Sequence, residues 1–209
     1  MKDTLLSYSG GLDSSSALHI YKDRIAMAIS FHYGSNHNDQ EIRMAKLNCE
    51  RLGIPHKVID LKNVFEGMKS ALLGEGHIPE GHYEDETMKA TVVPFRNGVF
   101  LSILTAIAED LNLSYVMLAS HSGDNAVYND CRPEFNKPMS EAMQAGTSNN
   151  ITISAPFESI GKPELAQLGI AAGMVPDQTY SCYVGEDTPC GECSTCRERD
   201  WALGLRKEP

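Results

Sequence analysis

The sequence predicts an α/β fold, a Rossmann-like parallel sheet with helices on both faces, followed by a small cysteine-rich appendage. Apolar runs of strand length alternate with segments of helical period through most of the chain, which is the pattern of a parallel sheet covered by helices. A glycine turn at Ser9–Ser14 follows the first apolar run, and four cysteines gather beyond Tyr180. We therefore expect an α/β domain over residues 1–179 and a segment packed on it over residues 180–209.

The elements follow one another in the order that such a sheet requires. Strands are expected at Thr4–Ser9, Ile25–Tyr33, His56–Leu61, Tyr115–Ser120 and Ile151–Ala155. Helices are expected at Ser14–Tyr21, Gln40–Gly53 and Gly98–Leu111, with a later helix opening at Lys162 and a short one closing the chain. Residues 72–97 are rich in glycine and charge and predict a long loop over the sheet, with His77 and His82 in a lid.

Length, charge and hydropathy exclude several classes of protein. A chain of 209 residues suits one domain with an appendage. The net charge of −10 argues against a nucleic-acid-binding surface, because such surfaces carry clustered Lys and Arg. No apolar run approaches the roughly 18 residues of a membrane span. The first residues lack the features of a secretory signal, so we expect a cytoplasmic protein without a membrane partner.

The turn Ser9-Gly10-Gly11-Leu12-Asp13-Ser14 joins the first strand to the first helix. A helix start exposes unpaired N–H groups and the positive end of the dipole, and glycine lets an anion approach that backbone. The turn therefore predicts a phosphate cradle. It is not the common P-loop, whose lysine it lacks. The alternative is a tight glycine turn in which Asp13 or Ser14 caps the helix without any ligand.

The C-terminal cysteines have the spacing C-x7-C-x2-C-x2-C, at Cys182, Cys190, Cys193 and Cys196. Four thiolates on one short loop can surround a Zn²⁺ ion tetrahedrally in a closed, structural site. Two alternatives are an iron–sulfur cluster, although the ferredoxin pattern continues differently, and two disulfides, which a cytosolic compartment disfavours. Cys49 lies on an apolar helical face and is expected to be a small buried hydrophobe.

The spelling SGGxDS after the first strand resembles the pyrophosphate loop of the N-type ATP pyrophosphatases, which cleave ATP between its α and β phosphates. The resemblance implies that the loop holds the departing pyrophosphate. By that resemblance, the nucleotide-binding residues are Tyr8, Ser9, Gly10, Gly11, Leu12, Asp13, Ser14 and Ser15.

Further segments are similar to the QueC family of deazapurine biosynthesis, over nearly the whole length. They are VPFRN (93–97) with FLS (100–102), DNAVYNDCRPEF (124–135), PFESIGKPELAQLG (156–169) and TYSCY (179–183). Two departures from the family pattern stand out. Glu41 follows His37 by four positions instead of three, and Phe95 replaces a frequent glycine, which would narrow a pocket wall.

The resemblance implies an ATP-dependent C–N ligase that converts 7-carboxy-7-deazaguanine and ammonia into 7-cyano-7-deazaguanine, by adenylation and through an amide. ATP, Mg²⁺ and Zn²⁺ are the implied cofactors, nucleic acid is not an implied partner, and the family's habit suggests a homodimer. The candidate catalytic residues are Asp13, Ser14, Arg96, Asp124, Asp130, Arg132 and Lys162.

These candidates have different expected roles. Arg96 and Arg132 offer guanidinium groups for phosphate or carboxylate. Lys162 would reach the phosphates, or be an exposed lysine at a helix start. Asp124 and Asp130 would hold Mg²⁺ or accept hydrogen bonds from the deazaguanine, or merely cap loops. His37 and His121 are expected near the pocket without assigned roles, and Tyr183 is expected to pack beside the cysteines.

Two other functions remain open at this point. A tRNA-thiolation enzyme of the same superfamily shares SGGLDS and sometimes carries an iron–sulfur cluster on its cysteines. A non-catalytic zinc-ribbon module would bind nucleic acid or protein, which the acidic balance disfavours.

Overall fold

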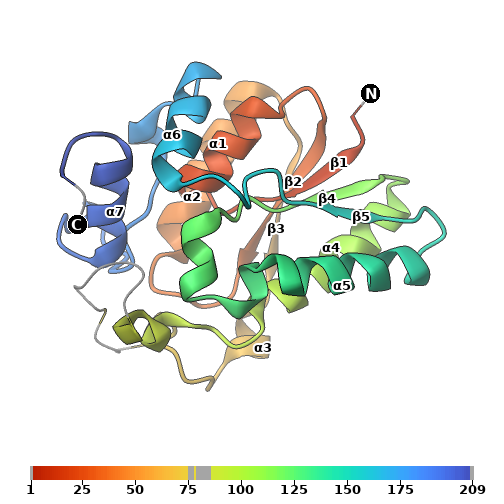
Figure 1. The fold of residues 1–209 in the computed structure, drawn as a ribbon, viewed down its shortest axis with the longest axis horizontal. Coiled ribbons are helices and arrows are strands. Elements are labelled where there is room, and N and C mark those ends of the chain that lie inside the picture. Colours follow the sequence, from red (N-terminus) through yellow and green to blue (C-terminus); the bar gives the residue numbers. More distant parts are fainter. Residues whose placement is uncertain (1, 75–77, 79–85, 208–209) are drawn as a thin grey trace.

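The computed structural model describes residues 2–74, 78 and 86–207 and contains a five-stranded parallel sheet (Figure 1). The strand order is β3-β2-β1-β4-β5. The strands are β1 (Thr4–Ser7), β2 (Ile25–His32), β3 (His56–Asp60), β4 (Tyr115–Met117) and β5 (Thr152–Ser154). The strand order reverses between β1 and β4, and open α/β sheets bind ligands at the carboxyl ends of the strands beside such a reversal.

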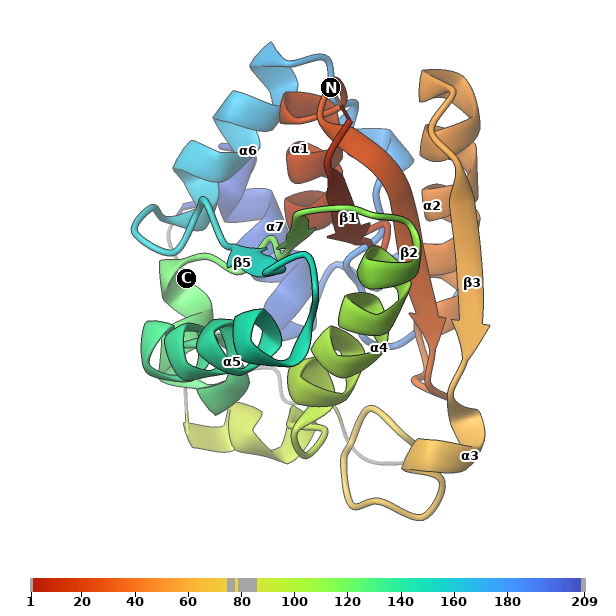
Figure 2. The same cartoon turned by 90° about the vertical axis from the view of Figure 1, so that its right-hand side faces the viewer.

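Helices cover both faces of the sheet, as the sequence predicted (Figures 1 and 2). They are α1 (Leu12–Ile20), α2 (Asn38–Leu52), α3 (Lys62–Phe65), α4 (Arg96–Asp110), α5 (Pro133–Gly146), α6 (Lys162–Ala171) and α7 (Ser194–Ala202). Short 3₁₀ helices are η1 (Glu86–Thr91), η2 (Ser122–Ala126), η3 (Asn129–Cys131) and η4 (Pro176–Gln178).

Successive residues of β1 supply the two halves of the core. Leu5 packs in a cluster with residues of α4 and α5, and Leu6 packs in another with residues of α1, α2 and α6. This alternation follows from the two-residue period of a strand, and both faces are apolar because a parallel sheet is buried on both sides. On the α4 side, Phe31 of β2 and Phe100 of α4 stack with their rings 4.1 Å apart.

The boundaries differ from the sequence prediction at the carboxyl ends of the strands. β1 ends at Ser7 and β4 at Met117, whereas the apolar runs continue further. The residues that follow these strands line a cavity, although Tyr8 and Leu118 still donate backbone hydrogen bonds to Ile29 and Ser154 of the neighbouring strands. Helix α1 begins at Leu12, two residues earlier than expected.

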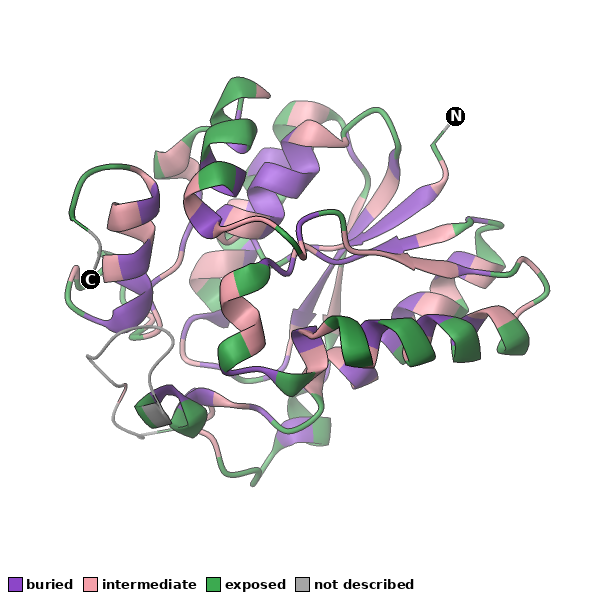
Figure 3. Cartoon of the chain, in the orientation of Figure 1, coloured by how far each residue is buried: buried purple, intermediate pink, exposed green. Residues whose placement is uncertain are grey.

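Residues 72–97 are not simply a loop. They include η1 and the first residues of α4, and Met88 of η1 is completely buried. Thr91 closes η1 with a hydrogen bond to the Met88 carbonyl, and its hydroxyl also contacts that of Tyr128. Helix α5, which the sequence analysis did not anticipate, begins with a proline and buries one side against the sheet (Figure 3). The expected lid residues, His77 and His82, lie outside the described residues.

The C-terminal segment returns to the first turn of the fold. The Tyr180 N–H donates to the Gly10 carbonyl at 3.1 Å, and α7 packs against α6. The described part of the chain contains no helix that is both long enough and apolar enough to cross a bilayer. This return brings α7 and the cysteine-rich stretch beside the end of β1, which decides the composition of the site.

Candidate active site

A cavity of about 210 Å³ opens at the carboxyl ends of β1, β2 and β4, beside the reversal of strand order. Its walls come from the β1–α1 turn, the starts of α2 and α4, the residues after β4, and the segment beyond Tyr180. The site is therefore assembled from segments that are far apart in the sequence. The volume and the polar lining suit a small-molecule ligand.

The Ser9–Ser14 turn brings two backbone N–H groups and two hydroxyl groups together at the start of α1. Gly10 has a φ of +99°, and a side chain there would collide with the Glu41 carbonyl, so only glycine fits. The Gly10 N–H donates to Ser14 Oγ at 3.2 Å, and the Gly11 N–H donates to Ser9 Oγ at 3.0 Å. Helix α1 has Gly11 as its N-cap without a side-chain cap, and Ser14 binds the Gly10 N–H that precedes the helix.

Of the other predicted loop residues, two line the cavity and one packs behind the loop. Tyr8 and Leu12 line the cavity, and both are almost completely buried. Ser15 is buried away from the cavity, where its hydroxyl lies 3.1 Å from that of Tyr8. Ser15 thus supports the loop from behind.

A group of charged residues, which we call the ion-pair cluster, lies at the α1 end of the cavity. It comprises Asp13, His121, Asp124, Lys162 and Glu198. Lys162 Nζ lies 3.1 Å from Asp13 Oδ2 and 2.7 Å from Glu198 Oε2. Lys162 is only 6% exposed, so it is not a surface lysine. Burial opposes its charge, but the two carboxylates outweigh burial and raise its pKa above the ordinary value.

His121 joins Asp13 to Asp124. Its Nδ1 accepts a hydrogen bond from the Gly123 N–H, and its Nε2 lies 3.9 Å from Asp13 Oδ2 and 3.8 Å from Asp124 Oδ1. Asp124 Oδ2 accepts from the His121 N–H, so Asp124 also caps η2. The buried Asp13 Oδ1 has no hydrogen-bond partner among the residues that the structure describes. A buried carboxylate oxygen beside a second carboxylate fits a Mg²⁺ ion, which prefers oxygen ligands.

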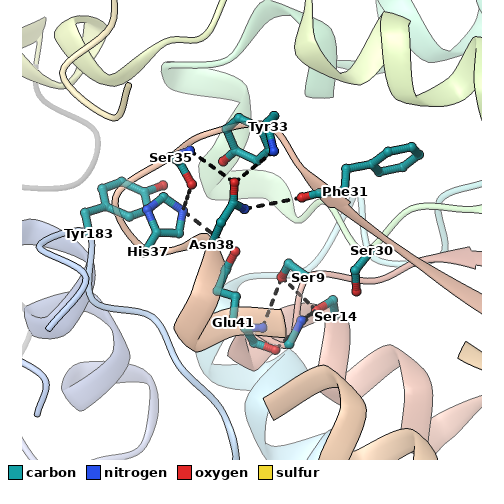
Figure 4. Close-up of polar contacts among 12 residues, drawn as sticks. Ser9, Ser14, Ser30, Phe31, Tyr33, Ser35, His37, Asn38, Glu41 and Tyr183 are labelled. Atoms are coloured by element: carbon teal, nitrogen blue, oxygen red, sulfur yellow. Dashed lines mark hydrogen bonds and ion pairs between the residues drawn. The ribbon is translucent and has the colours of Figure 1, made fainter. Parts of the chain in front are cut away.

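The α2 end of the cavity is polar in a different way (Figure 4). We call Ser35, His37, Glu41 and Tyr183 the α2 cluster. The rings of His37 and Tyr183 stack 4.9 Å apart, and His37 Nε2 lies 3.7 Å from Glu41 Oε2 and 3.5 Å from Ser35 Oγ. Burial lowers the pKa of His37 to about 3 and raises the pKa of Glu41 to about 7.

Arg96 lines the cavity from the first residue of α4. Its Nη1 donates to the Tyr33 hydroxyl at 2.9 Å, and its guanidinium lies 5.4 Å from the centre of the Tyr33 ring. A cation held by neutral hydroxyl and ring partners keeps its charge available for an anionic ligand.

Asp130 and Arg132 do not line this cavity. Asp130 Oδ2 accepts from the Asn97 N–H at 2.8 Å and so caps the start of α4. Arg132 donates through Nε to the Asn125 carbonyl at 2.7 Å. Asp130 therefore acts as a capping residue in this structure, which was the alternative role considered for it. Arg132 holds the connection between η2 and η3 through its bond to Asn125. Phe95 also faces away: it is largely exposed and packs edge-on against Phe135, so it does not narrow the pocket.

The four C-terminal cysteines form one cluster in which all the sulfur atoms lie within 4.8 Å of one another. The Sγ of Cys182 lies 3.5 Å from that of Cys190 and 4.0 Å from that of Cys193. Sulfur atoms around a tetrahedral Zn²⁺ at about 2.3 Å would be about 3.8 Å apart, so the four residues fit a metal ion. All four are free thiols, which excludes the two disulfides, and Cys49 is buried as expected.

The fold and the Ser9–Ser14 turn together define an α/β protein of the PP-loop fold. A solved structure of NMN synthetase from Francisella tularensis has the same fold, with a TM-score of 0.51, 13% identity, and coverage of 98% of this chain and 78% of that one. The chain belongs to the QueC family, since the model described as "Queuosine biosynthesis protein QueC" matches residues 3–206.

Curated relatives match over nearly their whole length, and each carries the name 7-cyano-7-deazaguanine synthase. The protein from Porphyromonas gingivalis is 45% identical over 97% of this chain and 92% of its own. The protein from Desulfotalea psychrophila is 43% identical over 97% of this chain and 94% of its own. The relative from Marinobacter nauticus is 42% identical over 92% of this chain and 88% of its own.

Two site residues were missed by the sequence analysis. Glu198, which holds Lys162, lies two residues beyond Cys196, and nothing in that sequence marks a carboxylate that meets another helix. Glu41 was noted only for its altered spacing from His37. Its position in the first turn of a helix that follows a strand was a usable signal, because such positions line the ligand edge of a parallel sheet.

Proposed function

We propose that this protein is a 7-cyano-7-deazaguanine synthase, which converts 7-carboxy-7-deazaguanine, ammonia and ATP into the 7-nitrile through an amide. The observation that carries the proposal is the single cavity that joins the Ser9–Ser14 turn to Arg96. One end suits the phosphates of ATP, and the other offers a guanidinium for a carboxylate. The identity to relatives of that name supports the same substrate.

The residues of the turn would hold the pyrophosphate that departs when the substrate carboxylate attacks the α-phosphate. The Gly10 and Gly11 N–H groups and the hydroxyls of Ser9 and Ser14 converge there, and α1 directs its positive end toward the same point. Lys162 brings a positive charge to this end from α6. These groups stabilise negative charge that grows on the leaving group, which lowers the barrier to adenylation.

Asp13 and Asp124 would hold Mg²⁺, and that ion would supply further charge neutralisation of the polyphosphate. Arg96, oriented by Tyr33, would hold the substrate carboxylate for attack. The four cysteines would hold Zn²⁺ in a closed site, where the ion would order the segment that carries Tyr183 and α7.

The test is to incubate the purified protein with ATP, Mg²⁺, ammonium and 7-carboxy-7-deazaguanine and to follow products by mass spectrometry. We expect the amide and the nitrile, with AMP and pyrophosphate. Absence of AMP, amide and nitrile in a protein that binds ATP would overturn the proposal. Iron and visible absorbance with sulfur transfer to tRNA would instead indicate the thiolation alternative.

A homodimer and a cytoplasmic location are further parts of this proposal. Light scattering on the full chain, at concentrations that bracket the assay, tests the first. Fractionation of the native cells tests the second.

A further inference from the structure

The Glu41 carboxyl lies in the cavity, beside the Ser9–Ser14 turn. Glu41 lines the cavity from the first turn of α2, and its side chain is 14% exposed. Figure 4 shows this side chain with its carboxyl in contact with His37. Its Oε1 would be 3.3 Å from a Cβ on Gly11, so the carboxyl touches the turn that receives the leaving group.

The groups that face Glu41 leave it without a strong counter-charge. Its ion-pair partner within the described residues is His37, and burial lowers the pKa of His37 to about 3, so that ring is neutral at pH 7. Arg96 acts on Glu41 from a distance and lowers its pKa, the hydroxyl of Ser9 does so by a hydrogen bond, and Asp13 raises it. Burial outweighs the two lowering effects, and the pKa of Glu41 is about 7.

The other carboxylates of the cavity are engaged elsewhere. Asp13 is held by Lys162 at 3.1 Å, and Asp124 accepts from the His121 backbone. The thiol of Cys131 has its pKa raised well above the ordinary value by burial, so it does not supply a base. Among the described groups that line the cavity, Glu41 is the acceptor best matched to proton transfer near neutral pH.

We propose, on the basis of the proposed function, that Glu41 is a further catalytic residue that accepts the protons released by the substrate nitrogen. In the first step the ammonia nitrogen bonds to the acyl carbon, the carbon–oxygen bond to AMP breaks, and one N–H proton passes to Glu41. In the second, the amide oxygen is adenylated by another ATP with loss of pyrophosphate. AMP then leaves as the two remaining nitrogen protons pass in turn to Glu41 and from it to water.

This role separates two half-reactions that an experiment can measure independently. Adenylation of the acid needs no ammonia and is followed by exchange of labelled pyrophosphate into ATP. Amide formation needs proton transfer from nitrogen. Hydroxylamine, which is less basic than ammonia and neutral at pH 7, traps the acyl adenylate with less need for a base.

The decisive variant is Glu41→Gln, with Glu50→Gln on the exposed side of the same helix as the control. We expect Glu41→Gln to keep pyrophosphate exchange within about threefold of wild type while losing about 10²–10⁴-fold in amide formation at saturating ammonia. Hydroxamate formation should be largely retained. Equal loss of exchange and amide formation, or wild-type amide formation, would overturn the role.

The pH profile of the wild-type protein gives an independent reading should the variant fail to fold. At constant free NH₃, amide formation should fall tenfold per pH unit below about pH 7, whereas pyrophosphate exchange should not show that limb. The proposal would be contradicted if both reactions lost rate below pH 7, or if neither reaction did. Failure of the proposed function looks different, because wild-type protein would then show no exchange that depends on the 7-carboxy acid.

Discussion

The two ends of the cavity are both buried, yet they treat charge in opposite ways. In the ion-pair cluster, Lys162 keeps its charge because Asp13 and Glu198 lie within 3.1 Å of it. In the α2 cluster, His37 and Glu41 lie 3.7 Å apart, and burial moves each toward its neutral form. Burial penalises any isolated charge, so a buried group either finds a partner of opposite sign or changes its protonation.

The difference corresponds to the chemistry that each end would perform. A phosphate site needs charges that persist through the whole reaction, and compensation by carboxylates ensures this at Lys162. A proton acceptor needs a pKa near the working pH, and desolvation without compensation supplies it at Glu41. The same physical term, loss of hydration, therefore yields two kinds of catalytic group in one cavity.

The largest effect should come from removing the cation of the ion-pair cluster. Lys162→Met keeps the length of the side chain but removes the positive charge that both carboxylates contact. The negative charges of Asp13 and Glu198 are then left without this cation. We expect pyrophosphate exchange to fall by about 10³-fold and the free energy of unfolding to fall by about 3 kcal/mol. Exchange assays and urea titration measure the two. Exposed Lys46→Met is the control, and exchange within tenfold of wild type would break the comparison.

Removing the metal should disturb both ends at once, because the cysteine-rich segment carries Tyr183 to one and Glu198 to the other. Cys193→Ser, or a strong chelator, should release one equivalent of metal and lower the Tm by about 5–10 °C. Elemental analysis and calorimetry follow these changes. Restoration of the chelated protein with zinc is the control. Loss of the metal at an unchanged Tm would show that the segment is held by packing alone.

A smaller change tests whether Glu198 positions Lys162. Glu198→Gln keeps the shape and a hydrogen-bonding group but removes one negative charge, while Asp13 still pairs with Lys162. We expect KM for ATP to rise about tenfold with little change in kcat, because the lysine is less well oriented toward bound phosphate. Exposed Glu164→Gln, on α6, is the control. An unchanged KM would limit Glu198 to a structural role.

The last expected effect is one of stability, and it separates the two ends of the cavity by pH. The pKa of Glu41 is raised by burial from 4.5 to about 7, so the folded protein binds more protons than the unfolded chain between these values. The free energy of unfolding should therefore fall as the pH rises through this range. Glu41→Gln should remove the dependence and be more stable than wild type by about 3 kcal/mol at pH 8.

Urea titrations at pH 4 and pH 8 measure this difference, which should be near zero at pH 4, below the ordinary pKa of the carboxyl. Lys162 provides the contrast, since its pKa is raised above the ordinary value and its stabilising charge persists throughout this range. Glu41→Gln and wild type with the same stability at both pH values would show that Glu41 is ionised in the folded protein.

Much of this was readable in advance from local patterns. The alternation of apolar runs with helical segments predicted the parallel sheet, and SGGLDS at Ser9–Ser14 predicted the tight glycine turn between β1 and α1. The cysteine spacing predicted a metal cluster, and the described thiols converge as expected. These features are local because a strand, a helix start or a four-cysteine loop is specified within a few residues.

The tertiary structure alone decided which functional groups meet. Asp130 and Arg132 stand in the same motif-like segment as Asp124, yet they brace backbone while Asp124 lines the cavity. Glu198 meets Lys162 only because α7 folds back onto α6. The sequence also could not predict the protonation of side chains, because the pKa of Glu41 depends on burial by segments distant in the sequence. Sequence patterns specify short-range geometry, whereas desolvation and ion pairing depend on every segment that surrounds a group.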